Sequence, residues 1–291
     1  MKESPIPNRT LHEGTFPARD SVLLYYRFWK SENTKNPLFL IVHGFGEHSR
    51  RYDDFLKKLE GLPLSFAAFD LRGHGRSGGE RVFVSRFEDY LSDLDDFLEH
   101  LRKAHGLSDS RLFLFGHSLG GQIAAYYTAA RPEQIRTLML SSPCIAPQLW
   151  VPGAGKLALL LSNLLPHIVL NNPVQTVFLT HDREEIARYK QDKLIQRRIT
   201  FRLAGEMVRA GAEIFKRAHE IRVPVYLFAA GNEIIVDKAA AKIFFERIAS
   251  GEKRWIEFEG FYHEILKENG REKVYEAMTS VLQKCLSGIP S

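Results

Sequence analysis

The sequence predicts an α/β protein with a mostly parallel, eight-stranded sheet, helices on both faces of the sheet and one helical insertion. Short apolar runs of strand length alternate with longer segments whose apolar residues recur at helical spacing. Clusters of glycine, proline and small polar residues separate these segments. The alternation stops near residue 143 and resumes near residue 221, which indicates an insertion. With 291 residues the chain can bury one large core.

Six of the eight strands are expected before the insertion. Residues 11–16 and 22–29 have the pattern of a hairpin, and turn-forming residues join them. The other four are expected at residues 38–42, 65–69, 112–115 and 137–140, and the first of these is a short continuous apolar run typical of a strand covered on both faces. Helices are expected at residues 51–60, from near residue 86, and from the glycines after residue 118 to about residue 130.

After the insertion, the last two strands are expected at residues 225–229 and 255–258, and two helices are expected at residues 238–248 and 272–285. We therefore assign residues 1–143 and 223–291 to the core and residues 144–222 to a helical cap. This cap is expected above the carboxyl ends of the strands, where open α/β sheets bind ligands. Within it, residues 184–193 and 202–219 have helical spacing. Residues 157–170 are too short to span a bilayer and predict a buried or interfacial helix pair.

One apolar run, at residues 113–121, breaks into glycines around a single serine. Gly116, Ser118 and Gly120 match G-x-S-x-G, the nucleophile elbow that exposes a serine hydroxyl at a sharp turn from strand to helix. We expect glycines here because a strained turn tolerates no Cβ nearby. The pattern also fits an ordinary glycine-rich turn, but the strand before it and the alanine-rich helix after it favour a catalytic serine.

A serine hydroxyl is a weak nucleophile, so Ser118 needs a base and an acid, which follow in the order Ser, Asp or Glu, His in this type of site. His263 comes just after the last expected strand and is the expected base. The loop after residue 229 carries two carboxylates. Glu233, nearest the strand end, is the expected acid, and Asp237 is the alternative because an aspartate directly before a helix is most often an N-cap.

The attacked carbonyl oxygen also needs hydrogen-bond donors in an oxyanion hole. These are normally the amide after the nucleophile and an amide from the loop after the third strand. In this chain they are the backbone N–H groups of Leu119 and Phe45. Gly44 and Gly46 would let that loop approach the substrate.

Two cofactor patterns are present in part and fail. Gly73, Gly75 and Gly78 spell G-x-G-x-x-G, but no helix opens directly on these glycines, so we expect no NAD or FAD site. His263 begins the zinc pattern H-E-x-x-H, but Lys267 stands at its last position, which excludes that metalloprotease site. The two cysteines match no metal or redox spacing.

Four stretches, in order, resemble the monoacylglycerol lipase and lysophospholipase branch of the α/β-hydrolases, among the serine aminopeptidase S33-like domains. They are residues 43–49, 70–77, 116–121 and 262–266. The resemblance implies the α/β-hydrolase fold and a carboxylic ester hydrolase, without metal or organic cofactor, that acts on single-chain lipids through an acyl-enzyme on Ser118. The branch usually carries aspartate where Glu233 stands, although some bacterial lysophospholipases carry glutamate, and this favours lysophospholipid slightly over monoacylglycerol.

The resemblance also implies an apolar cap lining for one acyl chain. The candidate residues for this lining are Leu157, Leu160, Leu161 and Leu164. Plain helix packing is an equally good explanation for any one of these leucines. A small-ester carboxylesterase or an acyltransferase would carry the same triad. A catalytically idle α/β-hydrolase that serves as a binding protein is a further alternative, because a fold alone does not establish chemistry.

The net charge of +5 is concentrated at residues 183–222, which carry eleven Lys or Arg against six Asp or Glu. Such a run is most often the solvated side of helices, and anionic lipid head groups are favoured over nucleic acid as an alternative. The expected partners are a small lipid ester and, as a hypothesis, an anionic membrane surface at the basic cap, with no nucleic acid. Residues 1–8 lack the apolar stretch of a signal peptide, so a cytoplasmic location is expected. The oligomeric state stays open.

Overall fold

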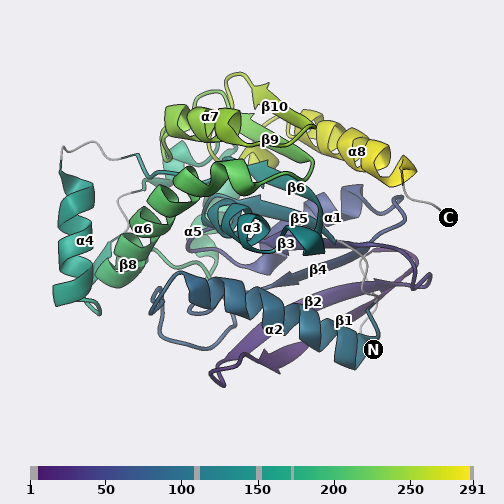
Figure 1. Ribbon diagram of the computed structural model, residues 1–291, viewed down its shortest axis with the longest axis horizontal. Helices are drawn as coiled ribbons and strands as arrows, with labels where there is room; N and C mark the ends of the chain where they lie inside the picture. The colour runs from purple at the N-terminus through teal and green to yellow at the C-terminus, as the bar shows by residue number, and fades with distance from the viewer. Residues whose placement is uncertain (1–5, 108–111, 149–152, 172–173, 289–291) are drawn as a thin grey trace.

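The computed structural model describes residues 6–107, 112–148, 153–171 and 174–288 (Figure 1). Its centre is an eight-stranded sheet in the order β1-β2-β4-β3-β5-β6-β9-β10. Only β2 runs opposite to the other strands of this sheet, which confirms the mostly parallel α/β fold expected from the sequence. The strands are β1 (Arg9–Pro17), β2 (Leu23–Ser31), β3 (Leu38–Val42), β4 (Ser65–Phe69), β5 (Leu112–His117), β6 (Ile135–Ser141), β9 (Val225–Ala230) and β10 (Lys253–Phe258).

The central strands sort their side chains into two cores. Every residue of β3 is buried, and its alternate positions face opposite sides of the sheet. Leu38 and Leu40 pack in one core, while Phe39 and Ile41 pack in the other. The first core lies under α2 (Glu88–His105), α3 (Leu119–Ala130) and α7 (Lys238–Arg247). The second lies under α1 (Asp53–Lys58) and α8 (Glu272–Ser287).

Part of the segment between β6 and β9 projects to one side of the sheet (Figure 1), while its residues Leu203, Ala210 and Ile214 pack in the first core. None of its described residues adds a strand to the main sheet. It contains α4 (Ala154–Leu164), β7 (Val169–Asn171), α5 (Arg183–Gln191), β8 (Arg198–Thr200) and α6 (Phe201–Arg217). Short 3₁₀ helices lie in this segment at η3 (Thr176–Phe178) and η4 (Ala218–Glu220), and elsewhere in the described residues at η1 (Ser49–Tyr52), η2 (Pro132–Gln134) and η5 (Ile265–Lys267).

Residues 157–170 differ from the helix pair that the sequence predicts. One helix, α4, ends at Leu164, and β7 follows it and pairs antiparallel with β8. The apolar pattern misled because it does not distinguish a buried helix from an exposed one followed by a short strand. α4 packs closely on α6, where a Cβ on Gly205 would lie 2.4 Å from the Cβ of Ser162. Most of its leucines point away from this contact and are exposed.

The expected helix at residues 51–60 is also shorter than the pattern indicates. It is divided between η1 and α1, and the chain turns at Leu59 toward β4. The loops that leave β3, β5, β9 and β10 all start at carboxyl ends of parallel strands, so they meet at one edge of the sheet. These four loops carry the residues of the candidate site.

Candidate active site

Ser118 stands between the end of β5 and the first residue of α3, with φ 52° and ψ −117°. A positive φ is costly for a residue with a Cβ, and such strain is concentrated at functional sites. The glycines around it are required by space rather than by a positive φ. A Cβ on Gly120 would lie 2.1 Å from the carbonyl oxygen of Val42, and one on Gly116 would lie 2.2 Å from that of Gly120. Glycine therefore lets β5, α3 and β3 approach closely enough for the sharp turn.

The backbone of Ser118 is fixed on both sides. Its N–H donates to the carbonyl oxygen of Ser141 at 3.0 Å. Its carbonyl oxygen accepts from the N–H of Gln122 at 3.1 Å and from that of Cys144 at 3.0 Å. The elbow is thus tied to the end of β6, to α3 and to the first residues after the sheet. This bonding holds the strained residue in place while leaving it partly exposed.

His263 and Glu233 form a buried pair above the sheet edge. Nδ1 of His263 lies 2.8 Å from Oε2 of Glu233, and the two side chains are 4% and 2% exposed. The other oxygen, Oε1, accepts from the N–H groups of Ile235 at 2.8 Å and Val236 at 3.2 Å. The carboxylate is therefore held by three donors, and its orientation toward the imidazole is fixed.

The pair shifts the pKa of both groups. Burial opposes the charged form of each, but their attraction and hydrogen bond outweigh it. The pKa of His263 is consequently raised and that of Glu233 is lowered. Asp237, the alternative acid, is the N-cap of α7, where its side chain accepts from the N–H of Ala240 at 2.9 Å. The structure brings Glu233 to the imidazole and leaves Asp237 at the start of the helix.

A hollow lies at the serine, where about 380 Å³ is free of protein atoms and part of this space is open to solvent. Its lining combines the elbow, the loop after β3, the loop after β10 that carries His263 (the histidine loop) and part of the insertion. The lining residues are Gly44, Phe45, Glu47, His117, Ser118, Val174, Leu179, Tyr189, Ile235, His263 and Glu264. The expected nucleophile Ser118, the expected base His263 and the expected oxyanion residue Phe45 therefore share one cavity.

The two expected oxyanion amides come from different elements of the fold. Leu119 is the first residue of α3, and a first-turn amide of a helix has no partner within the helix. Phe45 lies in the loop after β3, next to Gly46, which has a φ of +76°. A Cβ at Gly46 would lie 2.5 Å from the carbonyl oxygen of Gln196 in the insertion. The loop after β3 therefore needs glycine both for its turn and for its contact with the insertion.

The leucines expected to line an acyl site do not line this hollow. Leu157 and Leu160 are 55% exposed, Leu164 is 66% exposed, and Leu161 is half-buried on α4. The aliphatic side chains of the insertion that line the hollow are Val174 and Leu179, and Ile235 comes from the loop after β9. Sequence periodicity could not find these three, because they lie in irregular segments.

The insertion contacts two loops of the candidate site near the two ends of α5, the loop after β3 and the histidine loop. Beyond its carboxyl end, Asp192 bonds His48 at 2.8 Å, and the N–H of Gln196 donates to the carbonyl oxygen of Gly46 at 2.7 Å. At its amino end, the N–H of Glu264 donates to the carbonyl oxygen of Leu179 at 2.8 Å.

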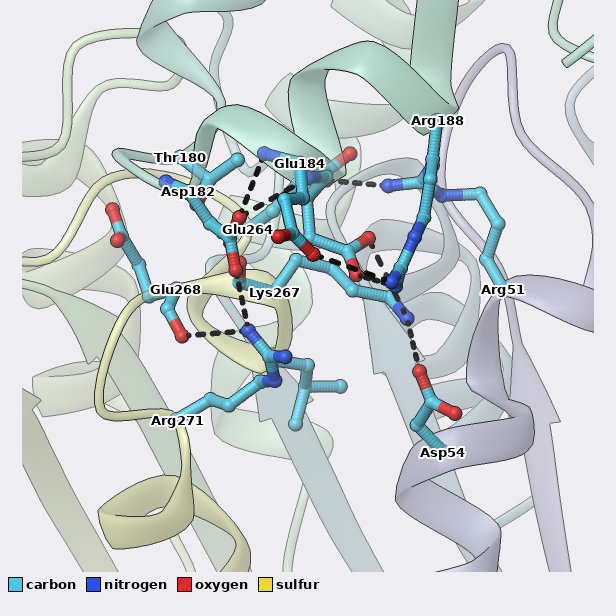
Figure 2. A network of polar contacts seen from close by, with 12 residues as sticks. Arg51, Asp54, Thr180, Asp182, Glu184, Arg188, Glu264, Lys267, Glu268 and Arg271 are labelled. Carbon is cyan, nitrogen blue, oxygen red and sulfur yellow. Dashed lines mark hydrogen bonds and ion pairs between the residues drawn. The ribbon is translucent and has the colours of Figure 1, made fainter. Parts of the chain in front are cut away.

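Figure 2 shows more of this second attachment, where the side chains of the histidine loop meet those of the insertion. Arg271 pairs with Asp182 at 2.9 Å, and Oγ1 of Thr180 donates to the carbonyl oxygen of Lys267 at 2.9 Å. Lys267 also reaches Asp54 of α1 at 3.6 Å. The histidine loop is therefore enclosed by charged contacts from the insertion and from the core.

Sequence reasoning missed a buried polar cluster beside the site, made by Glu47, Arg51, His117 and Glu264. The signal available was the i, i+4 spacing of Glu47 and Arg51 directly after the expected oxyanion residue. Burial dominates at His117 and lowers its pKa to about 4. The rings of His117 and His263 are 5.0 Å apart, and a neutral His117 adds no repulsion to the charged form of His263.

No three or more His, Cys, Asp or Glu side chains in the described part of the chain are arranged to hold a metal ion. Over the same residues, no helix has both the length and the apolar character that crossing a membrane requires.

The chain is similar to known proteins over most of its length. Residues 34–270 match the model of a family described as serine aminopeptidase, S33. Human monoglyceride lipase is 31% identical over 255 residues, which are 86% of this chain and 82% of that protein. The uncharacterized protein YnbC of Escherichia coli is 28% identical over 98% of this chain, which spans only 48% of that protein. The crystal structure of a monoacylglycerol lipase from Paleococcus ferrophilus superposes with a TM-score of 0.80, at 29% identity, over 95% of this chain and 99% of that one.

Proposed function

The chain belongs to the serine aminopeptidase S33 family and is a carboxylic ester hydrolase, and from this premise we propose that it cleaves lipid esters carrying one acyl chain. One observation carries the proposal: the buried contact of 2.8 Å between His263 and Glu233, in the cavity that Ser118 also lines. A lipid substrate is supported by the named activity of the human relative.

The proposed reaction begins at Ser118, whose Oγ attacks the ester carbonyl carbon while Nε2 of His263 accepts its proton. Glu233 holds the ring with Nδ1 protonated and stabilises the imidazolium that forms. The amides of Phe45 and Leu119 stabilise the oxyanion, and one such donor is worth about 10² to 10³ in rate. His263 then protonates the leaving alcohol. Water, deprotonated by the same ring, then attacks the acyl-enzyme, and the ring returns this proton to Oγ of Ser118 as the acid is released.

Residues 144–222 act in this proposal as the cap that closes the cavity over the acyl chain. Val174 and Leu179 supply apolar surface from the cap, and Ile235 supplies it from the core. Burying a methylene group contributes about 0.8 kcal/mol, so a chain that lies along these residues is favoured over a short one. Between a lysophospholipid and a monoacylglycerol, the glutamate at position 233 favours the first.

The exposed face of the cap suits peripheral contact with a lipid surface. Large apolar side chains that are more than a third exposed gather on α4 and the segment after it: Leu157, Leu160, Leu164, Leu165, Ile168, Leu170, Val177 and Phe178. Basic residues of the cap, such as Arg198, are exposed as well. An apolar face flanked by basic groups is the pattern of interfacial helices.

Vesicle binding tests this contact. More protein should bind anionic than neutral vesicles, added salt should reduce the difference, and a Leu160→Ser, Leu164→Ser double variant should bind less to both. Equal binding of the double variant and the unaltered protein would exclude this face.

Activity is tested first with Ser118→Ala, which should lose both ester hydrolysis and labelling by a fluorophosphonate probe. If the unaltered protein is not labelled, the idle binding protein is the better explanation. A chain-length series of p-nitrophenyl esters then separates a lipase from a small-ester carboxylesterase, because only a lipase should prefer long chains. Hydrolysis of lysophosphatidylcholine against monooleoylglycerol identifies the head group, and glycerol added as acceptor detects acyl transfer.

A further inference from the structure

Arg51 is a buried residue next to the candidate site, and its side chain contacts three residues from different segments, Glu47, Glu264 and Tyr189. It belongs to η1, and its side chain is 7% exposed. Nε donates to Oε2 of Glu47 at 2.9 Å, and Nη2 donates to Oε2 of Glu264 at 2.5 Å. The guanidinium also lies 5.0 Å from the ring centre of Tyr189 on α5. Figure 2 shows Arg51 directed toward Glu264 among the charged contacts of the histidine loop.

The first contact reaches the expected oxyanion amide. While Oε2 of Glu47 accepts from Arg51, Oε1 accepts from the N–H of Gly44 at 2.6 Å and from the hydroxyl of Tyr52 at 2.7 Å. Gly44 is the residue before Phe45, so this hydrogen bond fixes the peptide next to the proposed donor. A Cβ on Gly44 would lie 2.9 Å from the same carboxylate, which leaves the loop little freedom to move.

The second contact reaches the base. Glu264 directly follows His263, and its backbone N–H is bonded to the insertion at Leu179. Fixing the carboxylate of Glu264 therefore fixes the backbone from which the imidazole projects. The two loops are far apart in the sequence, and Arg51 contacts Glu264 across a separation of 213 positions. One guanidinium thus connects the loop after β3 to the loop after β10.

This arrangement is a poor device for stability alone. Taking three charged groups out of water costs several kcal/mol for each ion, and well-packed apolar residues can replace such clusters without loss. What a guanidinium adds is geometry, because its planar fork presents donors in fixed directions. Burial alone would raise the pKa of Glu47, yet Arg51 and the other neighbours lower it to about 2, so this carboxylate stays charged.

We propose that Arg51 is a positioning residue that holds the amide of Phe45 and the imidazole of His263 at the distance required by the transition state. The inference rests on the proposed function and adds a role for a residue that does not touch the substrate. A misplacement of 1 Å in such a site can lower the rate about 10²-fold. Lysine at position 51 would keep the charge and lose the fork that reaches both glutamates.

The test compares Arg51→Lys with Arg72→Lys, a matched control. Arg72 is also buried, and it pairs with two acids, Asp93 at 2.5 Å and Asp20 at 2.7 Å, neither of which lies in the loop after β3 or the loop after β10. With a p-nitrophenyl ester, Arg51→Lys should lower kcat about 10²-fold with little change in KM. Arg72→Lys should lose comparable stability in thermal unfolding and keep the kcat of the folded enzyme.

Glu264→Gln gives a second readout that a purely structural role would not move. A glutamine oxygen can still accept from Arg51, but one negative charge near the base is lost. The acid limb of the kcat/KM profile should therefore shift to lower pH. The charged or titratable groups around the imidazole are Glu233 from the loop after β9, Glu264 beside it, Glu47 and Arg51 from the segment after β3, His117 from β5 and Tyr189 from α5.

The outcomes separate the two proposals. A low kcat in Arg51→Lys but not in Arg72→Lys, with the acid shift in Glu264→Gln, supports the positioning role. An unchanged kcat in Arg51→Lys, or an equal loss in both lysine variants, overturns it while leaving Ser118 chemistry intact. Activity that survives Ser118→Ala overturns the proposed function itself.

Discussion

Replacing Glu233 by glutamine should lower kcat by about 10⁴-fold, or about 5 kcal/mol of transition-state stabilisation. The structure sets which way the new amide group turns. Oε1 faces the two N–H donors of Ile235 and Val236, whereas Oε2 faces the single nitrogen Nδ1 of His263. The glutamine oxygen should stay with the two donors, because the reverse orientation leaves both N–H groups without an acceptor.

The NH₂ group then faces Nδ1 and forces that nitrogen to be an acceptor. The proton moves to Nε2, and His263 cannot take a proton from Ser118. Asp237→Asn is the matched control, since asparagine caps a helix as well as aspartate does, and kcat should change by less than about threefold. Both variants are assayed with one soluble p-nitrophenyl ester, and thermal unfolding checks that each is folded. A larger loss for Asp237→Asn, or a tenth of normal activity in Glu233→Gln, would refute this reasoning.

Three further predictions concern the pH dependence of activity, backbone packing at a glycine and thiol reactivity. Burial lowers the pKa of His263, but the adjacent carboxylate raises it more, so kcat/KM should fall with acid through a pKa above the ordinary 6.5; a limb below 6.5 would contradict this. Gly120→Ala should prevent stable folding, because its Cβ would meet a backbone oxygen at 2.1 Å, whereas Gly61→Ala, with nothing within 4 Å, should unfold at nearly the normal temperature. Burial raises the pKa of Cys144 to about 12, so a disulfide reagent should modify only Cys285 in the native protein and both thiols after denaturation. Modification of both before unfolding would count against the buried position.

Much of the core could be predicted from sequence because its strands are buried on both faces. The runs at residues 38–42 and 65–69 match β3 and β4 at both ends. The insertion was harder, since apolar residues there lie on an exposed helix and pair in a short sheet instead of packing in a core. Local pattern carries no information about which side of such a helix will be covered.

Some residues of the candidate site could likewise be predicted from sequence, and others could not. Ser118, Glu233 and His263 could be placed because chain order and strand ends restrict where a nucleophile, an acid and a base can lie. Arg51 and Glu264 could not be paired from sequence, because their contact depends on how distant loops meet in three dimensions. Residue spacing in the sequence describes neighbours along the chain, whereas Arg51 and Glu264 lie in segments that are distant in the sequence.

The insertion leaves the sheet after β6 and returns as β9, and these two strands are neighbours. The N–H of Ser142, just past β6, donates to the carbonyl oxygen of Phe228 in β9 at 3.0 Å. The exit and the return therefore lie side by side whatever is placed between them, and closing a longer loop costs little more than closing a shorter one. This junction is a natural splice point. A chimera that carries a relative's segment in place of residues 144–222 should retain the strand order and the nucleophile. Exchanging this segment could therefore change substrate specificity without changing the core.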